Sequence, residues 1–184
     1  MDRLFIFLAA GLLALQALVL TLFGQPLIAA SGAVMLWVGE VLSPENSQHI
    51  SDWYTLSHVV HGLLFYWALS YFFPRVPVLG RMLVALGIEV AWEVLENTPM
   101  IIQHYREQAL AQGYTGDSVL NSLSDSIAML IGFFAARKFP VWVAVVLGLL
   151  FEGVALYCIR DNLTLNVINL IYPFDFIANW QLGS

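Results

Sequence analysis

The chain has 184 residues, of which 60% are hydrophobic and only 11% are charged, and it carries a formal net charge of −6. Soluble domains contain about 25% charged residues, so this composition excludes a soluble globular protein and is typical of a chain embedded in a membrane. The acidic balance argues against nucleic-acid binding. The single cysteine, Cys158, excludes an internal disulfide and a cysteine-based metal cluster.

Five apolar segments follow one another along the chain, at about residues 4–23, 55–73, 79–98, 119–137 and 139–159. Each has about the 20 residues that a helix needs to cross a hydrocarbon core of about 30 Å. The first is too long for the apolar region of a typical signal peptide, so we expect it to be retained. We therefore predict an all-α fold, in which residues 1–184 form a single domain, a polytopic integral membrane helical bundle.

Two further apolar stretches are too short or too interrupted to be spans. Residues 27–42 contain Glu40 near their end, and residues 163–177 contain two asparagines, Pro173 and Asp175. We expect both stretches to lie in the membrane interface or to re-enter the membrane without crossing it.

The basic residues predict the orientation of the bundle. With five spans and the N-terminus inside, the inner side holds five basic residues and the outer side only two. The inner ones are Arg3, Arg75, Arg81, Arg137 and Lys138, and the outer ones are Arg106 and Arg160. The positive-inside rule therefore predicts a cytoplasmic N-terminus. In a bacterium the chain would lie in the inner membrane, with its outer loops in the periplasm.

Several polar residues of the predicted spans lie at a similar depth. A charged group in hydrocarbon costs about 2.5–3.5 kcal/mol on insertion scales, so such groups are expected to be functional. At about 1.5 Å of rise per residue, Glu93 and Asp125 lie about 18 Å and His61 about 21 Å from the inner surface. Glu89 shares a helical face with Glu93 and Glu96 but lies lower, near mid-membrane. This common depth predicts a polar site that opens to the outer side.

The side chains at this depth can support acid–base or metal chemistry. We predict His61, Glu93 and Asp125 as catalytic residues, since a buried acid beside a histidine is typical of general acid–base sites. We predict His58, His61 and Glu93 as ligands of a divalent transition metal, because histidine with carboxylate suits Zn, Fe or Mn. Metal-free chemistry and a structural hydrogen-bond network between helices are the alternatives.

Substrate binding is predicted for four residues, namely His58, Glu96, Asn121 and Arg160. Arg160 ends the last span at the outer surface. Its guanidinium can hold a phosphate or carboxylate head group there, or it can snorkel to the interface beside Asp161.

Two features of the outer side leave alternatives open. Asp117 shares a helical stripe with Asn121 and Asp125, and it is also well placed to cap the helix that follows Gly116. The polar segment 43–55 is either a lid over the site or a solvated loop.

Four stretches of the chain resemble an uncharacterised bacterial inner-membrane family that is catalogued only as a domain of unknown function. They are SPENSQHISDWYTLSHVVHGLLFY, EVAWEVLENTPMI, GYTGDSVLNSLSDSIAMLIGF and IRDNLTLNVI. This resemblance covers most of the chain after about residue 25 and implies no particular activity.

A looser likeness is to VanZ-like membrane proteins, which share a histidine in one span, a glutamate in the next and an Asp-x-x-x-Asn helix with small residues following. The matching positions here are His58 or His61, Glu93, Asp117 with Asn121, Ala128 and Gly132. That likeness implies a role in the cell envelope and in glycopeptide tolerance.

The site therefore predicts a hydrolase or transferase that acts on a lipid or lipid-linked envelope substrate at the outer leaflet. The alternative is a non-enzymatic protein that binds a lipid, quinone or ion, or an accessory subunit of a larger membrane complex. Membrane lipid is the expected partner in the first case. A homo-oligomer is compatible with both, and the sequence leaves open whether the protein is an enzyme.

Overall fold

The computed structural model describes residues 2–111 and 113–183, which form eight helices and no strand. The helices are α1 (Asp2–Leu22), α2 (Thr55–Phe72), α3 (Val78–Glu96), α4 (Pro99–Arg106), α5 (Val119–Lys138), α6 (Val141–Ile159), α7 (Leu163–Ile171) and α8 (Asp175–Leu182). The five long helices coincide with the five predicted segments, and their ends differ from the predicted bounds by two residues or fewer. The all-α prediction is confirmed.

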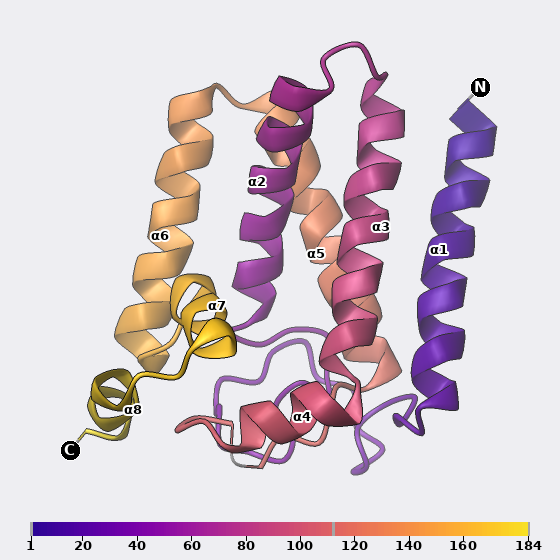
Figure 1. Cartoon of the computed structure of the whole chain (residues 1–184). Coiled ribbons are helices and arrows are strands. Elements are labelled where there is room, and N and C mark those ends of the chain that lie inside the picture. The colour runs from indigo at the N-terminus through magenta and orange to yellow at the C-terminus, as the bar shows by residue number, and fades with distance from the viewer. Residues whose placement is uncertain (1, 112, 184) are drawn as a thin grey trace.

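The long helices lie side by side along one direction (Figure 1). The α2–α3 and α5–α6 connections lie at the end of the bundle that holds the N-terminus. The short helices α4, α7 and α8, the long segment between α1 and α2, and the C-terminus lie at the opposite end. The two chain termini are therefore at opposite ends of the bundle.

Three helices are long and apolar enough to cross a membrane, over Arg3–Leu22, Val119–Lys138 and Val141–Ile159. The α2 and α3 helices do not meet the same criterion. They hold the two histidines and three glutamates of the predicted site, together with Arg81, and these residues make both helices more polar. Length and composition thus support three membrane-spanning helices.

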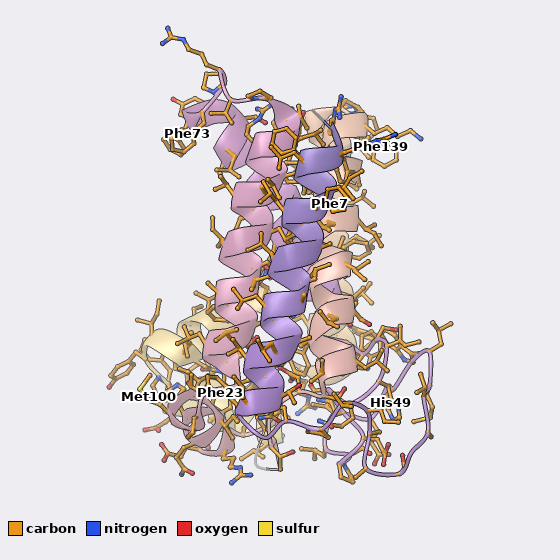
Figure 2. All side chains as sticks on the ribbon, turned by 90° about the vertical axis from the view of Figure 1, so that its right-hand side faces the viewer. Phe7, Phe23, His49, Phe73, Met100 and Phe139 are labelled. Atoms are coloured by element: carbon orange, nitrogen blue, oxygen red, sulfur yellow. The ribbon has the colours of Figure 1, made fainter. Side chains whose placement is uncertain are left out.

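The outward faces of the bundle are apolar. Phe7 on α1 is 73% exposed and Leu149 on α6 is 68% exposed, and only 11% of the apolar window of each of these two helices is buried. Figure 2 shows side chains such as Phe7, Phe73 and Phe139 projecting from the bundle surface. Soluble monomers rarely expose continuous apolar surface on this scale, so the pattern supports membrane association.

α2 and α5 pack against each other through their backbones. A Cβ atom on Gly62 would lie 1.9 Å from the Met129 carbonyl oxygen, and one on Gly132 would lie 2.1 Å from the Val59 carbonyl oxygen. Small residues that allow such close approach are typical of helix pairs in membranes. Beside this contact, Leu86, Met129 and Phe133 form the fully buried centre of the core.

The end of the bundle opposite the N-terminus contains the two stretches that were predicted not to be spans. Residues 27–42 form no helix, whereas residues 163–177 contain α7 and the start of α8. The α4 helix was not predicted, although it begins with a common signal. The Thr98 side chain caps it by accepting a bond from the Ile101 N–H, and Pro99 opens it.

Candidate functional site

His58 is the centre of the polar cluster between α2, α3 and α5. Its Nδ1 atom lies 2.5 Å from Glu89 Oε1 and 3.3 Å from Glu93 Oε1, and its Nε2 atom lies 3.9 Å from Asp125 Oδ2. All four side chains are buried. The structure thus brings His58, Glu93 and Asp125 together, three of the residues that the sequence predicts for the site.

Glu89 also belongs to this cluster, although the depth argument set it apart. It is fully buried, and its second oxygen, Oε2, lies 3.1 Å from His61 Nδ1. One carboxyl group therefore holds both histidines of α2. The i,i+4 spacing of Glu89 and Glu93 was the signal that could have identified Glu89 as a site residue.

Glu93 is connected to α1 by a chain of hydrogen bonds. The Ser122 hydroxyl donates to Glu93 Oε2 at 2.6 Å, and the Gln16 amide donates to the same serine oxygen at 2.7 Å. Gln16 is fully buried and accepts a bond from the Ser126 hydroxyl through its own oxygen at 2.9 Å. Gln16 was not predicted as a site residue, although a lone amide in an apolar helix indicates a buried polar partner.

Two carboxylate oxygens of the cluster lack hydrogen-bond partners within the described residues. They are Glu93 Oε1 and Asp125 Oδ1, and both are inaccessible to solvent. Buried carboxylate oxygens are normally paired, because an unpaired one loses its solvation without replacement. Each of these two atoms therefore suggests a proton, water or cation beside it that protein atoms do not supply.

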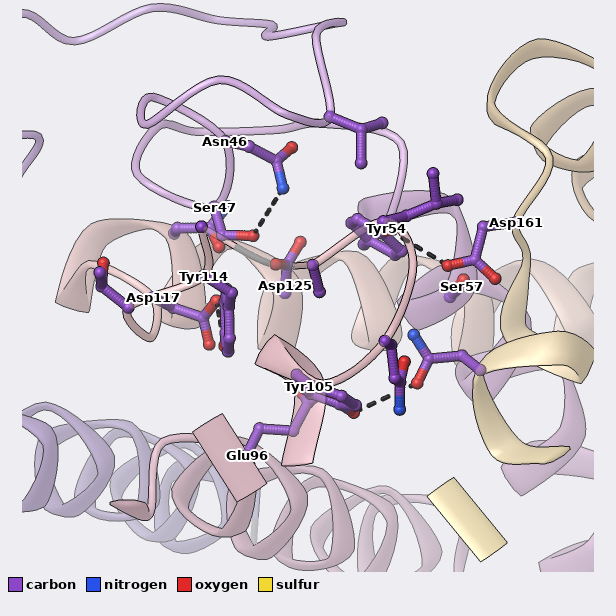
Figure 3. Close-up of a pocket in the computed structure, with 18 of the residues that line it drawn as sticks. Asn46, Ser47, Tyr54, Ser57, Glu96, Tyr105, Tyr114, Asp117, Asp125 and Asp161 are labelled. Atoms are coloured by element: carbon purple, nitrogen blue, oxygen red, sulfur yellow. Dashed lines mark hydrogen bonds between the residues drawn. The ribbon is translucent and has the colours of Figure 1, made fainter. Parts of the chain in front are cut away.

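A cavity of about 90 Å³ adjoins the cluster, and the described residues that line it include His58, His61, Glu93, Glu96, Asn121 and Asp125. Figure 3 shows part of its lining, with Glu96 and Tyr105 across from Asp125 and Ser57, and Tyr114 beside Asp117. The lining contains carboxyl, amide and hydroxyl groups but no lysine or arginine among the described residues. A cavity of this size holds an ion or a few waters.

Glu96 and Asp117 are held on the outer side of this cavity by tyrosines. The Tyr105 hydroxyl donates to Glu96 Oε1 at 2.7 Å, and the Tyr114 hydroxyl donates to Asp117 Oδ1 at 2.9 Å. Burial raises the pKa of Asp117 to about 6, although hydrogen bonds from Asn97 and Tyr114 oppose this shift. A carboxyl with such a pKa can change protonation near neutral pH.

Asp117 does not cap α5. Ser118 is the N-cap residue, and its hydroxyl accepts a hydrogen bond from the Asn121 N–H at 3.1 Å. The Asp117 carboxyl instead accepts a hydrogen bond from the Asn97 amide, at 2.6 Å. The predicted turn before the helix is confirmed at Gly116, which has a positive φ of 94°.

The polar segment 43–55 lies against the N-terminal end of α5. The Asn121 amide donates to the His49 carbonyl oxygen at 2.9 Å, and the Ser118 hydroxyl donates to the Gln48 carbonyl oxygen at 2.9 Å. The Gln48 side chain in turn donates to the Gly116 carbonyl oxygen at 2.8 Å. The segment therefore forms a wall of the cavity that hydrogen bonds hold against α5. Asn121 contributes one of these bonds.

Arg160 does not line the cavity, although the next residue, Asp161, does. Its guanidinium donates to the Trp180 carbonyl oxygen at 3.0 Å and lies over the ring of the same residue. The predicted contact of Arg160 with a head group stays a prediction. Glu152, on the same helix, accepts bonds from the Leu163 and Thr164 N–H groups and so caps α7.

Three groups of side chains in the described chain have the spacing of metal ligands. They are His58–His61–Glu89, His58–Glu93–Asp125 and Glu93–Glu96–Asp117. The predicted ligand set of His58, His61 and Glu93 is not one of them, and its members divide between the first two groups. His58 and Glu93 are each shared by two groups, so any ion in this region would contact at least one of them.

The chain belongs to a family described as a protein of unknown function (DUF2585), whose model matches residues 20–183. A UPF0314 protein of Sphingopyxis alaskensis is 49% identical over 176 residues, which are 96% of this chain and 94% of that protein. Those of Brucella anthropi and Paracoccus denitrificans are 49% and 47% identical and cover 94% and 91% of this chain, and 88% and 86% of their own length.

The predicted membership of an uncharacterised bacterial family is thereby confirmed. No solved structure matches the chain. The looser likeness to VanZ-like membrane proteins stays a prediction.

Proposed function

For this member of the DUF2585 family, we propose an integral inner-membrane protein with five spans, a cytoplasmic N-terminus and a polar site that faces the periplasm. The five long helices are arranged side by side, and the cavity lies at the end opposite the N-terminus, which supports this proposal. Arg75 lies in the α2–α3 connection, and Arg137 and Lys138 end α5, so basic residues gather at the N-terminal end. Under the positive-inside rule, this distribution supports a cytoplasmic position for that end.

The proposed activity is that of a hydrolase or transferase acting on a lipid or lipid-linked envelope substrate. One observation carries it, namely a buried histidine, His58, within 4 Å of three carboxyl groups at the wall of a cavity. Glu93 and Asp125 are the proposed acid–base or metal-binding groups, and a divalent transition metal is the proposed cofactor. His61, which lines the same cavity, is proposed to contact the reacting group.

The lining of the cavity restricts the substrate. It presents acids, amides, hydroxyls and the imidazoles of His58 and His61, without a lysine or arginine in the described chain, so a phosphate would meet several carboxyl groups and no guanidinium or ammonium group. We therefore propose that the part of the substrate inside the cavity is neutral or positively charged, such as a hydroxyl or amine group. A phosphate of the same lipid would remain outside, where Arg106 and Arg160 are the available cations.

The second candidate is a non-enzymatic membrane protein that binds a small ligand, such as an ion, or that serves as a subunit of a larger complex. The small volume of the cavity, about 90 Å³, favours this alternative, because a whole lipid or quinone head group does not fit without movement of the loops. Glu89, which joins His58 to His61, further suggests a partly structural role for the polar network.

A complementation experiment separates these candidates. The gene is deleted in a host bacterium, and the envelope lipids are compared by mass spectrometry after wild-type, Glu93→Gln, Asp125→Asn and Glu107→Gln chains are restored. If the protein is an enzyme, the first two variants should accumulate and melt like wild type. The lipid profile should nevertheless stay that of the deletion strain. Glu107 is exposed, so its variant serves as the control. Full restoration by Glu93→Gln and Asp125→Asn would rule out the catalytic proposal.

A further inference from the structure

The polar cluster contains more carboxyl groups than its hydrogen bonds can use. Glu89, Glu93 and Asp125 surround a single imidazole, that of His58, and no lysine or arginine of the described chain lines the adjoining cavity. Buried carboxylates without a compensating cation repel one another strongly. A protein that keeps three of them around one histidine therefore needs either protons or a cation at this point.

Two carboxylate oxygens without a hydrogen-bond partner in the described chain are available to such a cation. Glu93 Oε1 and Asp125 Oδ1 have no hydrogen-bond partner, and both residues line the cavity. Glu93 is 1% exposed and Asp125 is 4% exposed, so bulk water does not replace the missing partners. Each oxygen retains a free lone pair for a metal ion.

The other polar atoms of the cluster prepare His58 as a ligand. Glu89 Oε1 lies 2.5 Å from His58 Nδ1, and in the tautomer in which Nδ1–H donates to this oxygen, Nε2 carries the lone pair. His58 Nε2 is 3.9 Å from Asp125 Oδ2, which is beyond a hydrogen bond. Two ligand atoms that each lie about 2.1 Å from one metal ion are at most about 4.2 Å apart, so this separation suits a shared ion.

We infer that His58 Nε2, Glu93 and Asp125 bind one divalent transition metal ion, and that Glu89 orients His58 from behind. One candidate ligand atom of each of these residues lies within 4.8 Å of those of the other two, so the longest separation would shorten when an ion binds. One nitrogen and two carboxylate ligands suit Zn²⁺, Mn²⁺ or Fe²⁺, and three protein ligands leave a position open toward the cavity. A histidine held by a carboxylate on its other nitrogen is the usual arrangement behind a metal ligand.

This assignment differs from the one that the sequence predicts. His61 contacts Glu89 rather than Glu93 and lies outside the inferred ligand set, whereas Asp125 lies inside it. The inference rests on the proposed function for the use of the ion in catalysis, but the binding of the ion can be measured without any activity.

The test is equilibrium dialysis of the chelator-treated, full-length protein in mild detergent against Zn²⁺ and, separately, Mn²⁺. We expect about one equivalent of at least one metal in the wild type. Glu93→Gln and Asp125→Asn should weaken binding more than about 100-fold, and Glu89→Gln should weaken it about 10–100-fold, the range for second-shell partners. His61→Ala is the matched control and should bind within a few-fold of wild type. Thermal melting confirms that each variant is folded.

The outcomes separate the metal site from the proposed activity. No binding of either metal by the wild type overturns the inference, as does a loss in His61→Ala without a loss in Asp125→Asn. If the wild type binds no metal but Glu93→Gln still abolishes the lipid phenotype, the enzyme proposal survives without this cofactor. If metal binds as expected but Glu93→Gln restores the phenotype fully, the metal site stands and the enzyme proposal fails.

Discussion

Gly62 on α2 and Gly132 on α5 face each other so closely that a Cβ atom on Gly132 would lie 3.2 Å from the Gly62 Cα atom. His58 lies one helical turn from Gly62, and Asp125 lies two turns from Gly132. The backbone contact of the two glycines therefore sets the register in which His58 and Asp125 approach each other across α2 and α5.

A methyl group at Gly132 should disturb both the packing and the site. In Gly132→Ala the new Cβ atom would meet the Val59 carbonyl oxygen at 2.1 Å, so the two helices must separate. Overpacking of this kind costs about 1–3 kcal/mol, and we expect a lower melting temperature in detergent together with weaker Zn²⁺ binding. Gly153→Ala on α6 is the control, because nothing lies within 4 Å of its Cβ position. Equal melting of the two variants would contradict the close contact.

Removal of the Asn121 amide should loosen the segment that covers the cavity. Asn121→Ala loses the bond to the His49 carbonyl oxygen, and a single such bond contributes about 0.5–1.5 kcal/mol. We expect amide hydrogen exchange of residues 43–52 to become about 2- to 10-fold faster, as the same range of free energies implies.

The control for this loop experiment is Ser124→Ala, which removes a hydroxyl that donates only to the Leu120 carbonyl oxygen of its own helix. Exchange in residues 43–52 should not change in that variant. If Asn121→Ala leaves the same segment fully protected, the wall is held by other contacts and Asn121 is free for the predicted role in substrate binding.

The five long helices could be predicted because hydropathy and helix breakers act locally along the chain. The meeting of His58, Glu93 and Asp125 could also be predicted, since charged groups in a membrane avoid hydrocarbon and therefore gather at one depth. The pairing of His58 with Glu89 was missed for a geometric reason. Depth was counted from Arg75 and Arg81, but α2 ends at Phe72 and α3 begins at Val78. An error of three residues on each helix shifts the depths counted along α2 relative to those counted along α3 by about 9 Å.

Other features of the site depend on residues that are distant in sequence. Asp117 has the spacing of a helix cap, but its carboxyl group accepts a hydrogen bond from the Asn97 amide, 20 residues earlier. Ser118 is the cap instead. The exposed guanidinium of Arg160 finds its partner at Trp180, in a short helix that hydropathy alone did not predict. Local patterns do not contain these partners, so the sequence could not assign these roles.

The stability of the end of the bundle opposite the N-terminus should depend on pH through Asp161. Burial raises the pKa of this carboxyl from about 3.8 to about 6, although the Asn162 N–H and the Tyr54 hydroxyl donate to it and oppose the shift. Since the folded chain binds the proton more tightly than the unfolded chain, the stabilisation is full below about pH 4 and is lost as the pH rises through about 6.

We therefore expect the melting temperature in detergent to fall between about pH 4 and pH 6, and the fall to be smaller in Asp161→Asn. The contribution of this group is at most about 3 kcal/mol across the whole transition. Asp117, which burial also shifts to a pKa of about 6, should keep part of the pH dependence in the variant. Glu107→Gln, at an exposed carboxyl, serves as the control. An identical pH slope in wild type and Asp161→Asn would contradict the assignment.

Gln16 offers a test of how the supporting network acts on the site from a distance. Gln16→Leu keeps the approximate volume of the side chain but removes the donor to Ser122 and the acceptor for Ser126. The cost of leaving buried partners unpaired is about 1–3 kcal/mol, so the melting temperature should fall. The freed Ser122 hydroxyl should also hold Glu93 less firmly, and Zn²⁺ affinity should decrease by less than in Glu89→Gln.

Thr21→Val on the same helix is the matched control for this network, because the Thr21 hydroxyl donates only to the Ala17 carbonyl oxygen within α1. A wild-type melting temperature and wild-type Zn²⁺ affinity in Gln16→Leu would show that α1 is a passive span. A lower melting temperature with unchanged affinity would confine Gln16 to packing. Only a decrease in both would mean that the hydrogen bonds from Gln16 through Ser122 position Glu93 for the metal.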